Sequence, residues 1–334
     1  MKHIVFAVLL PAFLAGCGGS NPFEADTDTD TGGDAGSATS VTDLPGTDSP
    51  GISTTILRYE TDDEYTFKTV TYDSVNDKLL IVGLPFDGDD AYALDAPLSP
   101  IGPDNALQQY NVYVADPTSV DDDYDGGGGA PITQDDYIAI YGTGSGADPK
   151  TSFVVVRTGA YLGYGFGGFV IQRNVTDTVI PTTGQANYFG NYAGIRVFEG
   201  SSGAQLVTGD MTMEIDFANL VDAGAVSGSV TGREIFTTAG VKLEDMPSIG
   251  FVVQPNRLDE NGEFMGSVFT LNPNDGEELQ AGTYYAVLAG ADAEEIAGII
   301  VLTGDEDFNS TGTDLFLSTS KTSVQETGGF ILER

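Results

Sequence analysis

The sequence predicts an all-β protein, with an N-terminal antiparallel β domain followed by a small eight-stranded antiparallel β-barrel. Two observations predict this fold class. From residue 54 onward, short segments rich in Val, Ile, Thr, Tyr and Phe alternate with clusters of Gly, Asp, Asn and Pro. The chain of 334 residues also contains 44 Gly, 15 Tyr and 18 Phe but no Trp, a composition that favours strands and turns over helices.

Residues 1–16 have the pattern of a cleaved export signal. Lys2 precedes an apolar run from Ile4 to Leu14, which is too short to make a good membrane-spanning helix. The run ends in four residues that resemble the lipobox of bacterial lipoproteins: Leu14, Ala15, Gly16 and Cys17. In such proteins the cysteine becomes the first mature residue and carries the lipids, so we expect lipidation of Cys17 and a membrane anchor. The alternative is an ordinary secretory signal with an unpaired thiol.

Residues 17–53 are expected to form a disordered acidic tether. Gly, Ser, Thr, Asp and Pro dominate this segment, so it cannot bury enough apolar surface to offset the entropy cost of ordering. Gly18 follows the cysteine at the position where an inner-membrane retention signal would usually have Asp. This difference favours the outer membrane as the location.

Residues 54–180 are predicted to form the N-terminal β domain. Its strand-like segments read "TTILRYE", "EYTFKTVTY", "KLLIVGLPF", "QQYNVYVA", "DYIAIYG", "TSFVVVR" and "YGFGGFVIQR". The Gly-rich part of the last segment has neither a phosphate-binding Lys nor a following helical pattern, which argues against a nucleotide loop. We therefore interpret it as an aromatic and glycine-rich strand.

Residues 181–334 are predicted to form the barrel. In "DMTMEIDF", Met211, Met213, Ile215 and Phe217 alternate with polar residues, which is typical of a strand with one buried face. Eight or nine such segments occur in this half, enough to close a small barrel and remove its edges. Glycines inside these segments fit the bends and close approaches of a tight barrel: Gly194, Gly228, Gly266 and Gly298.

Several short stretches of the C-terminal half resemble the barrel of surface lipoproteins such as transferrin-binding protein B and factor H binding protein. The matches are Gly282-Thr283-Tyr284, then Ala293, Glu295, Ile296, Ala297 and Gly298, and upstream Asp216-Phe217. The resemblance covers residues 181 to about 320. It implies a handle-like β domain before the barrel, a lipid anchor, an outward-facing location and a binding function. It identifies no ligand and no contact residue.

The charge and the missing side chains restrict the function further. Fifty acidic against 13 basic residues give a formal net charge of −37, which would repel nucleic acid and anionic lipid headgroups. The single histidine, His3, lies in the signal segment, so the mature chain lacks the Ser-His-Asp and Cys-His triads and histidine metal ligation.

Catalysis by a pair of carboxylates, of the kind that hydrolyses glycosides, stays an open possibility. The adjacent Glu294 and Glu295 are poor candidates, because neighbouring side chains on a strand point to opposite faces. We instead expect "ADAEEIA" to connect two barrel strands, with Gly298 allowing the close turn into the second.

An acidic loop offers a calcium hypothesis. "DDDYDGGGG" places Asp121, Asp123, Asp125 and Gly126 at the spacing of an EF-hand opening, but Ile132 stands where the final Glu ligand belongs. The residues at 305–314 have the same partial pattern. We expect no required cofactor, with calcium at Asp121, Asp123 and Asp125 as the open alternative to a mobile acidic loop.

The sequence thus predicts a lipid-anchored outer-membrane protein at the cell surface that binds a partner protein or a metal- or haem-related cargo without catalysis. Two alternatives are a carboxylate-dependent enzyme acting on glycans and a calcium-stabilised structural surface protein. The ligand-binding residues stay unknown at this level.

Overall fold

The computed structural model describes residues 56–59, 67, 69–73, 75–84, 91–99, 110–115, 135–145, 149–159, 163–219, 226–253, 258, 262–305 and 323–334. It shows two antiparallel sheets and almost no helix in these ranges. Among the described residues, no helix has the length and apolar character needed to cross a bilayer.

The first sheet is a curled layer of eight antiparallel strands in the order β1-β8-β7-β6-β5-β4-β3-β2. Its strands are β1 (Ile56–Tyr59), β2 (Thr69–Asp73), β3 (Lys78–Val82), β4 (Tyr92–Leu94), β5 (Tyr110–Ala115), β6 (Tyr137–Thr143), β7 (Thr151–Arg157) and β8 (Gly167–Arg173). In β3 the period-2 pattern is clear, because Leu79 and Ile81 are buried while the residues between and beside them are exposed.

The central strands of the first sheet are buried on both faces. In β7 every residue is buried, which explains the continuous apolar run "FVVV" in place of an alternating pattern. Val154 and Val156 belong to a core on the face turned away from the barrel, and Phe153 and Val155 belong to a core shared with the barrel. The first sheet is therefore a layer between two hydrophobic cores.

The second sheet closes into an eight-stranded antiparallel barrel, as the sequence predicts. Its strands are β9 (Gln185–Phe198), β10 (Ala204–Asp216), β11 (Val226–Thr237), β13 (Ile249–Phe251), β14 (Glu263–Leu271), β15 (Glu278–Ala289), β16 (Glu295–Asp305) and β17 (Ser323–Glu333). They follow the order β10-β9-β17-β16-β15-β14-β13-β11, and the pairing of β10 with β11 completes the ring. The short β12 (Lys242–Met246) pairs with β11 beside this ring.

The strand β10 shows how the alternating pattern builds the barrel wall. Met211, Met213 and Ile215 are buried in the barrel core, whereas Thr212 and Glu214 between them are exposed. The predicted inside and outside faces of this strand are confirmed. Burying the alternate side chains fixes the register, since a slip of one residue would turn Thr212 and Glu214 inward.

The connection from β15 to β16 is shorter than the predicted segment at 291–297, because β16 already begins at Glu295, and Gly298 has a different role. The chain turns at residues 290–294, where Gly290 has φ 97° and Ala293 has φ 51°. Gly298 lies inside β16, opposite Phe330 of β17, and a Cβ atom at this position would overlap the Phe330 ring. The expectation that Gly298 allows the turn was wrong: the glycine makes room for an aromatic ring of the barrel core.

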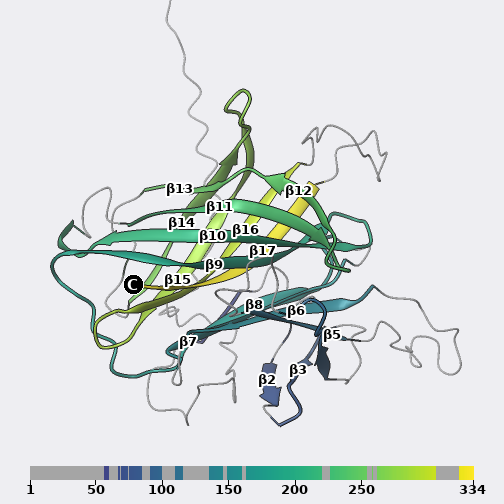
Figure 1. Ribbon diagram of the computed structural model, residues 1–334, viewed down its shortest axis with the longest axis horizontal. Coiled ribbons are helices and arrows are strands. Elements are labelled where there is room, and N and C mark those ends of the chain that lie inside the picture. Colours follow the sequence, from purple (N-terminus) through teal and green to yellow (C-terminus); the bar gives the residue numbers. More distant parts are fainter. Residues whose placement is uncertain are drawn as a thin grey trace, which may run out of the picture.

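The first sheet packs against the outside of the barrel wall formed by β9, β15, β16 and β17 (Figure 1). The shared core joins Phe153, Val155 and Ile171 of the first sheet to apolar side chains of that wall, including Ile195 and Ile299. The last strand of the first sheet ends at Arg173 and the barrel begins at Gln185. The predicted boundary at residue 181 lies in this connection, and the division into two separate domains stays a prediction.

Candidate functional site

The site residues predicted from the sequence lie outside the described part of the chain. This holds for the lipobox with Cys17 and for the acidic loop with Asp121, Asp123 and Asp125. Lipidation and calcium binding therefore stay predictions. Within the described ranges, no three His, Cys, Asp or Glu side chains are grouped closely enough to hold a metal ion.

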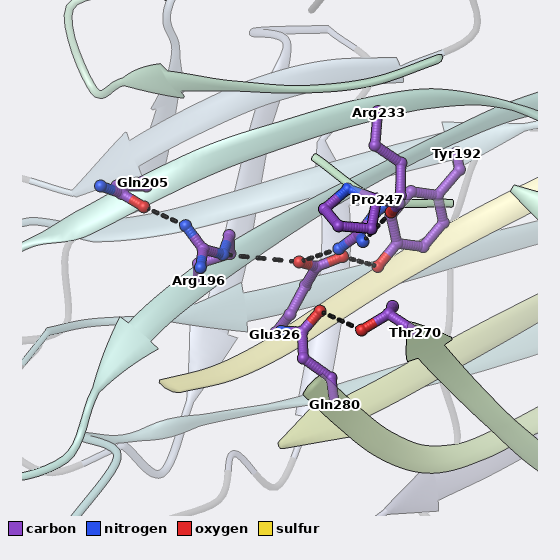
Figure 2. A network of polar contacts seen from close by, with 8 residues as sticks. All are labelled: Tyr192, Arg196, Gln205, Arg233, Pro247, Thr270, Gln280 and Glu326. Atoms are coloured by element: carbon purple, nitrogen blue, oxygen red, sulfur yellow. Dashed lines mark hydrogen bonds and ion pairs between the residues drawn. The ribbon is translucent and has the colours of Figure 1, made fainter. Parts of the chain in front are cut away.

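Two clusters of charged and polar side chains lie in the described part of the chain, and the first is buried inside the barrel (Figure 2). Glu326 of β17 accepts a hydrogen bond from Nη2 of Arg233 on β11 at 2.5 Å, and Nε of Arg196 on β9 lies 3.5 Å from the same carboxylate oxygen. The hydroxyl of Tyr192 donates to the other oxygen at 2.8 Å. The carboxylate thus joins three strands that are far apart in the sequence.

Other polar groups near this carboxylate form further hydrogen bonds, whereas Nε of Arg233 is buried without a hydrogen-bond partner among the described residues. Nη1 of Arg233 donates to the carbonyl of Pro247 at 2.6 Å, Arg196 donates to Gln205, and Thr270 lies 3.4 Å from Gln280. Burial next to the negative charge of Glu326 holds the pKa of Tyr192 well above its ordinary value, so this phenol stays protonated.

The cluster belongs to a barrel interior that is filled with side chains. Arg196, Arg233, Tyr188, Tyr284 and Phe264 are among the largest side chains that are fully buried. Apolar residues from all eight barrel strands form the core around the polar cluster. The buried charges accordingly hold the wall strands together from inside, and side chains occupy the volume that a ligand inside the barrel would need.

The second cluster lies at the junction between the first sheet and the barrel. Three carboxyl groups at the ends of β16 and β17 meet the connection between β6 and β7. The Lys150 ammonium lies 3.3 Å from Glu294, and the Thr151 hydroxyl donates to Glu295. The backbone N–H and the hydroxyl of Ser145 donate to Glu333 at 2.7 and 2.6 Å.

The two adjacent glutamates of this junction have opposite environments. Glu294 is 36% exposed and Glu295 is 4% exposed, so their side chains diverge as the sequence predicts. Burial raises the pKa of Glu295 to about 7, with a further contribution from Glu333, and its hydrogen bond with Thr151 opposes the rise. Partial burial raises the pKa of Glu294, but the backbone N–H of Asp292 and the charge of Lys150 outweigh it, so this pKa is lowered.

A carboxyl group with a pKa near 7 beside a second carboxyl group is a pattern also found in enzyme active sites. Here the pair Glu295 and Glu333 lies under the β6–β7 connection. Thr151 donates to the first, Ser145 donates to the second, and the backbone of Gly144 lies directly against the Glu295 carboxylate. The geometry supports a contact between two sheets, because groups of the first sheet surround the buried Glu295 and bind Glu333.

Further polar contacts extend along the junction. The Tyr110 hydroxyl bridges two barrel strands, donating to the Asn191 carbonyl at 2.5 Å and accepting from the Ile331 N–H at 2.8 Å. Arg157 donates to Thr327, and Nε of Arg173 donates to the carbonyl of Leu288 at 2.8 Å. Sequence reasoning missed all of these residues, because the partners of each contact are about 80 to 220 positions apart and no local pattern marks them.

No protein-family model and no curated protein matches the chain. Solved structures similar to it include a double mutant of transferrin binding protein B from Haemophilus parasuis Hp5, with a TM-score of 0.35, 10% identity, and coverage of 83% of this chain and 42% of that one. Isotype 1 transferrin binding protein B from serogroup B Neisseria meningitidis gives a TM-score of 0.30, 14% identity, and coverage of 80% and 42%. A structure described as a surface lipoprotein gives a TM-score of 0.27, 13% identity, and coverage of 54% and 76%.

The chain thus spans less than half the length of the two transferrin binding proteins. Both belong to the group of proteins that the barrel sequence resembles. Identities of 10–14% assign no role to any residue of this chain.

Proposed function

We propose that this chain is a lipid-anchored protein of the outer membrane, displayed on the cell surface, that binds a partner protein on its outer faces without catalysis. The observation that carries the proposal is the filled barrel. Arg196, Arg233 and Glu326 share its interior with a continuous apolar core, so the barrel is a solid body. A partner would contact the outside of such a body or its loops.

The same observation favours a protein over a metal- or haem-related cargo. A small barrel that carries a cargo needs free interior volume. In this barrel, aromatic and arginine side chains occupy that volume. A protein partner requires only surface, and antiparallel wall strands with polar outward residues, such as Thr212 and Glu214, provide it.

The anchoring part of the proposal rests on the sequence. Cys17 follows Leu14-Ala15-Gly16, and the Gly- and Asp-rich residues 18–53 would separate the folded sheets from the lipid. The acidic composition would keep the displayed domain soluble and would disfavour acidic partners.

The absence of catalysis is also proposed, and the junction supports it. In the described pair Glu295 and Glu333, the carboxyl with the raised pKa, Glu295, is buried against the first sheet. Glu333 is half-buried and accepts from Ser145. An enzyme acting on glycans would require two carboxyl groups that face each other across an open cleft.

The anchor and the display can be tested in cells. We expect Cys17→Ser to release the protein from the membrane fraction, and protease added to intact cells to cleave the wild-type chain in the tether. Retention of the variant in the membrane fraction would contradict the lipid anchor. Protection of the wild-type chain from protease would contradict surface display.

The binding function requires a separate experiment with purified components. The mature chain without its lipid would be immobilised and incubated with extracellular proteins from the natural surroundings, and each captured protein would then be purified and titrated calorimetrically. We expect saturable binding to one protein, retained by the folded chain and lost by the urea-unfolded chain. Turnover of a glycan that depends on one pair of carboxyl groups would contradict the proposal.

A further inference from the structure

Glu295 and Glu333 form a carboxyl pair across two neighbouring strands. They are direct Cα partners in the antiparallel pairing of β16 with β17, so their side chains leave the barrel wall on the same face. Side chains placed in this way are about 5 Å apart at Cβ, where two negative charges repel each other. The face is the one on which the first sheet packs, so their ionisation affects the junction directly.

The other charged groups near Glu295 offer it little compensation. Lys150, on the connection that covers it, places its ammonium on Glu294 at 3.3 Å. Arg334 follows Glu333, and its backbone N–H donates to the carbonyl of Glu294. On β5, Tyr110 lies close enough that its own pKa is raised by burial and by both carboxylates of the pair. Glu295 thus accepts from the Thr151 hydroxyl and from the backbone N–H groups of Lys150 and Thr151, and it faces the charge of Glu333. Burial outweighs these hydrogen bonds, because the pKa of Glu295 is still raised.

We propose that this junction is a pH-responsive contact between the first sheet and the barrel, closed while Glu295 carries a proton and weakened when Glu295 and Glu333 are both ionised. The proton on Glu295 lets its carboxyl lie buried against Gly144 and Thr151 without a net charge. Loss of that proton leaves two negative charges side by side under the β6–β7 connection. Opening the junction lets water solvate them.

The direction of the pH effect follows from the two protonation states. In the closed junction the pKa of Glu295 is about 7, and in an open, solvated junction it returns toward 4.5. The group therefore contributes its full stabilisation below about pH 4.5, and the contribution is lost as pH rises toward and through about 7. Acidification closes the junction and neutral or alkaline conditions loosen it.

The test is hydrogen exchange of the full mature chain between about pH 5 and pH 8, with each rate divided by its intrinsic rate to give a protection factor. For the wild type we expect the protection factors of the peptides covering β7 and the end of β17 to fall as the pH rises. The fall should be up to about tenfold per pH unit and should level off above the closed-state pKa of Glu295. The variant Glu295→Gln, which is neutral at every pH, should keep high protection throughout. The matched control Glu294→Gln should follow the wild type, because Glu294 is partly exposed and is paired with Lys150.

A second variant keeps the proposal testable if Glu295→Gln does not fold. Thr151→Val removes the hydroxyl that lowers the pKa of Glu295 in the closed junction, so the loss of protection should continue to a higher pH than in the wild type. Protection that is constant with pH in the wild type would overturn the proposal. An equal pH dependence in the wild type and Glu295→Gln would overturn it as well.

Discussion

Nη2 of Arg233 lies 2.5 Å from Oε2 of Glu326, and both side chains are fully buried inside the barrel. Arg196 approaches the same carboxylate from the neighbouring strand β9. Two guanidinium groups and one carboxylate therefore share an interior whose other side chains are mainly apolar. The attraction among them offsets the cost of removing them from water only while every partner is present.

Removing the central charge should destabilise the barrel strongly. In Glu326→Gln the two arginines lose their buried counter-charge, and we expect the free energy of unfolding to fall by about 3–5 kcal/mol. Urea unfolding followed by circular dichroism measures this loss. Glu214→Gln, on the exposed face of β10, is the matched control and should change stability by less than about 0.5 kcal/mol. A similar effect of both substitutions would show that the buried cluster contributes nothing specific.

Replacing the whole cluster should have a different outcome. In the triple variant Arg196→Met, Arg233→Met, Glu326→Leu no charge is left without its partner, and the apolar side chains join the surrounding core. We expect a folded barrel whose unfolding free energy equals or exceeds that of the wild type by up to about 4 kcal/mol. A triple variant as unstable as Glu326→Gln would show that the hydrogen bonds to Tyr192 and Pro247 are themselves required.

A side chain at Gly298 should destabilise the barrel. A Cβ atom there would overlap the ring of Phe330, so Gly298→Ala should lower the unfolding free energy by about 1–3 kcal/mol. Adding Phe330→Leu should recover part of this loss, because the smaller side chain frees the space. A double-mutant cycle with urea unfolding measures the coupling between the two positions, and additive effects would contradict the proposed overlap.

The sequence alone predicts much of the architecture, because a strand with one solvent-exposed face has alternating apolar and polar residues. Met211, Met213 and Ile215 alternate with polar residues, and that alternation identifies β10 and its buried face. Strands buried on both faces, such as β7, are found as apolar runs, but the run does not reveal which face meets the barrel.

The polar clusters escaped prediction for a physical reason. Arg233 and Glu326 are 93 positions apart, and Thr151 and Glu295 are 144 apart. An arginine or a glutamate in a strand normally marks a solvated position, and only closure of the barrel or docking of the two sheets places these side chains inside. Gly298 was assigned to a turn for the same reason, since the ring that it accommodates lies on another strand.

Neighbouring hydroxyl groups on β7 should respond oppositely to truncation. Thr151 donates to Glu295 at the junction, whereas the hydroxyl of Ser152 is fully buried on the other face and has no hydrogen-bond partner among the described residues. We expect Thr151→Ala to cost about 1.5–3 kcal/mol of unfolding free energy and Ser152→Ala to increase it by about 1 kcal/mol. Thermal and urea unfolding of both variants measure the difference. A large loss in Ser152→Ala would show that this hydroxyl has a partner after all.

The hydroxyl of Tyr110 on β5 should couple the first sheet to the hydrogen-bonding ladder of the barrel. It accepts from the N–H of Ile331 and donates to the carbonyl of Asn191, two residues that face each other across β17 and β9. Tyr110→Phe leaves both backbone groups buried without this bridge, so we expect a loss of about 1–3 kcal/mol.

Hydrogen exchange localises this effect, because the Ile331 amide should exchange faster in the variant while the Met213 amide in β10 keeps its wild-type rate. Tyr72→Phe is the control, since its hydroxyl donates to Asp77 within the first sheet at 2.8 Å and should leave Ile331 unchanged. Unchanged exchange at Ile331 in Tyr110→Phe would contradict the bridge. Of the two tyrosines, only Tyr110 contacts the barrel strands through its hydroxyl. Faster exchange at Ile331 in both variants would therefore indicate a general loosening of the first sheet and not the loss of a specific bridge.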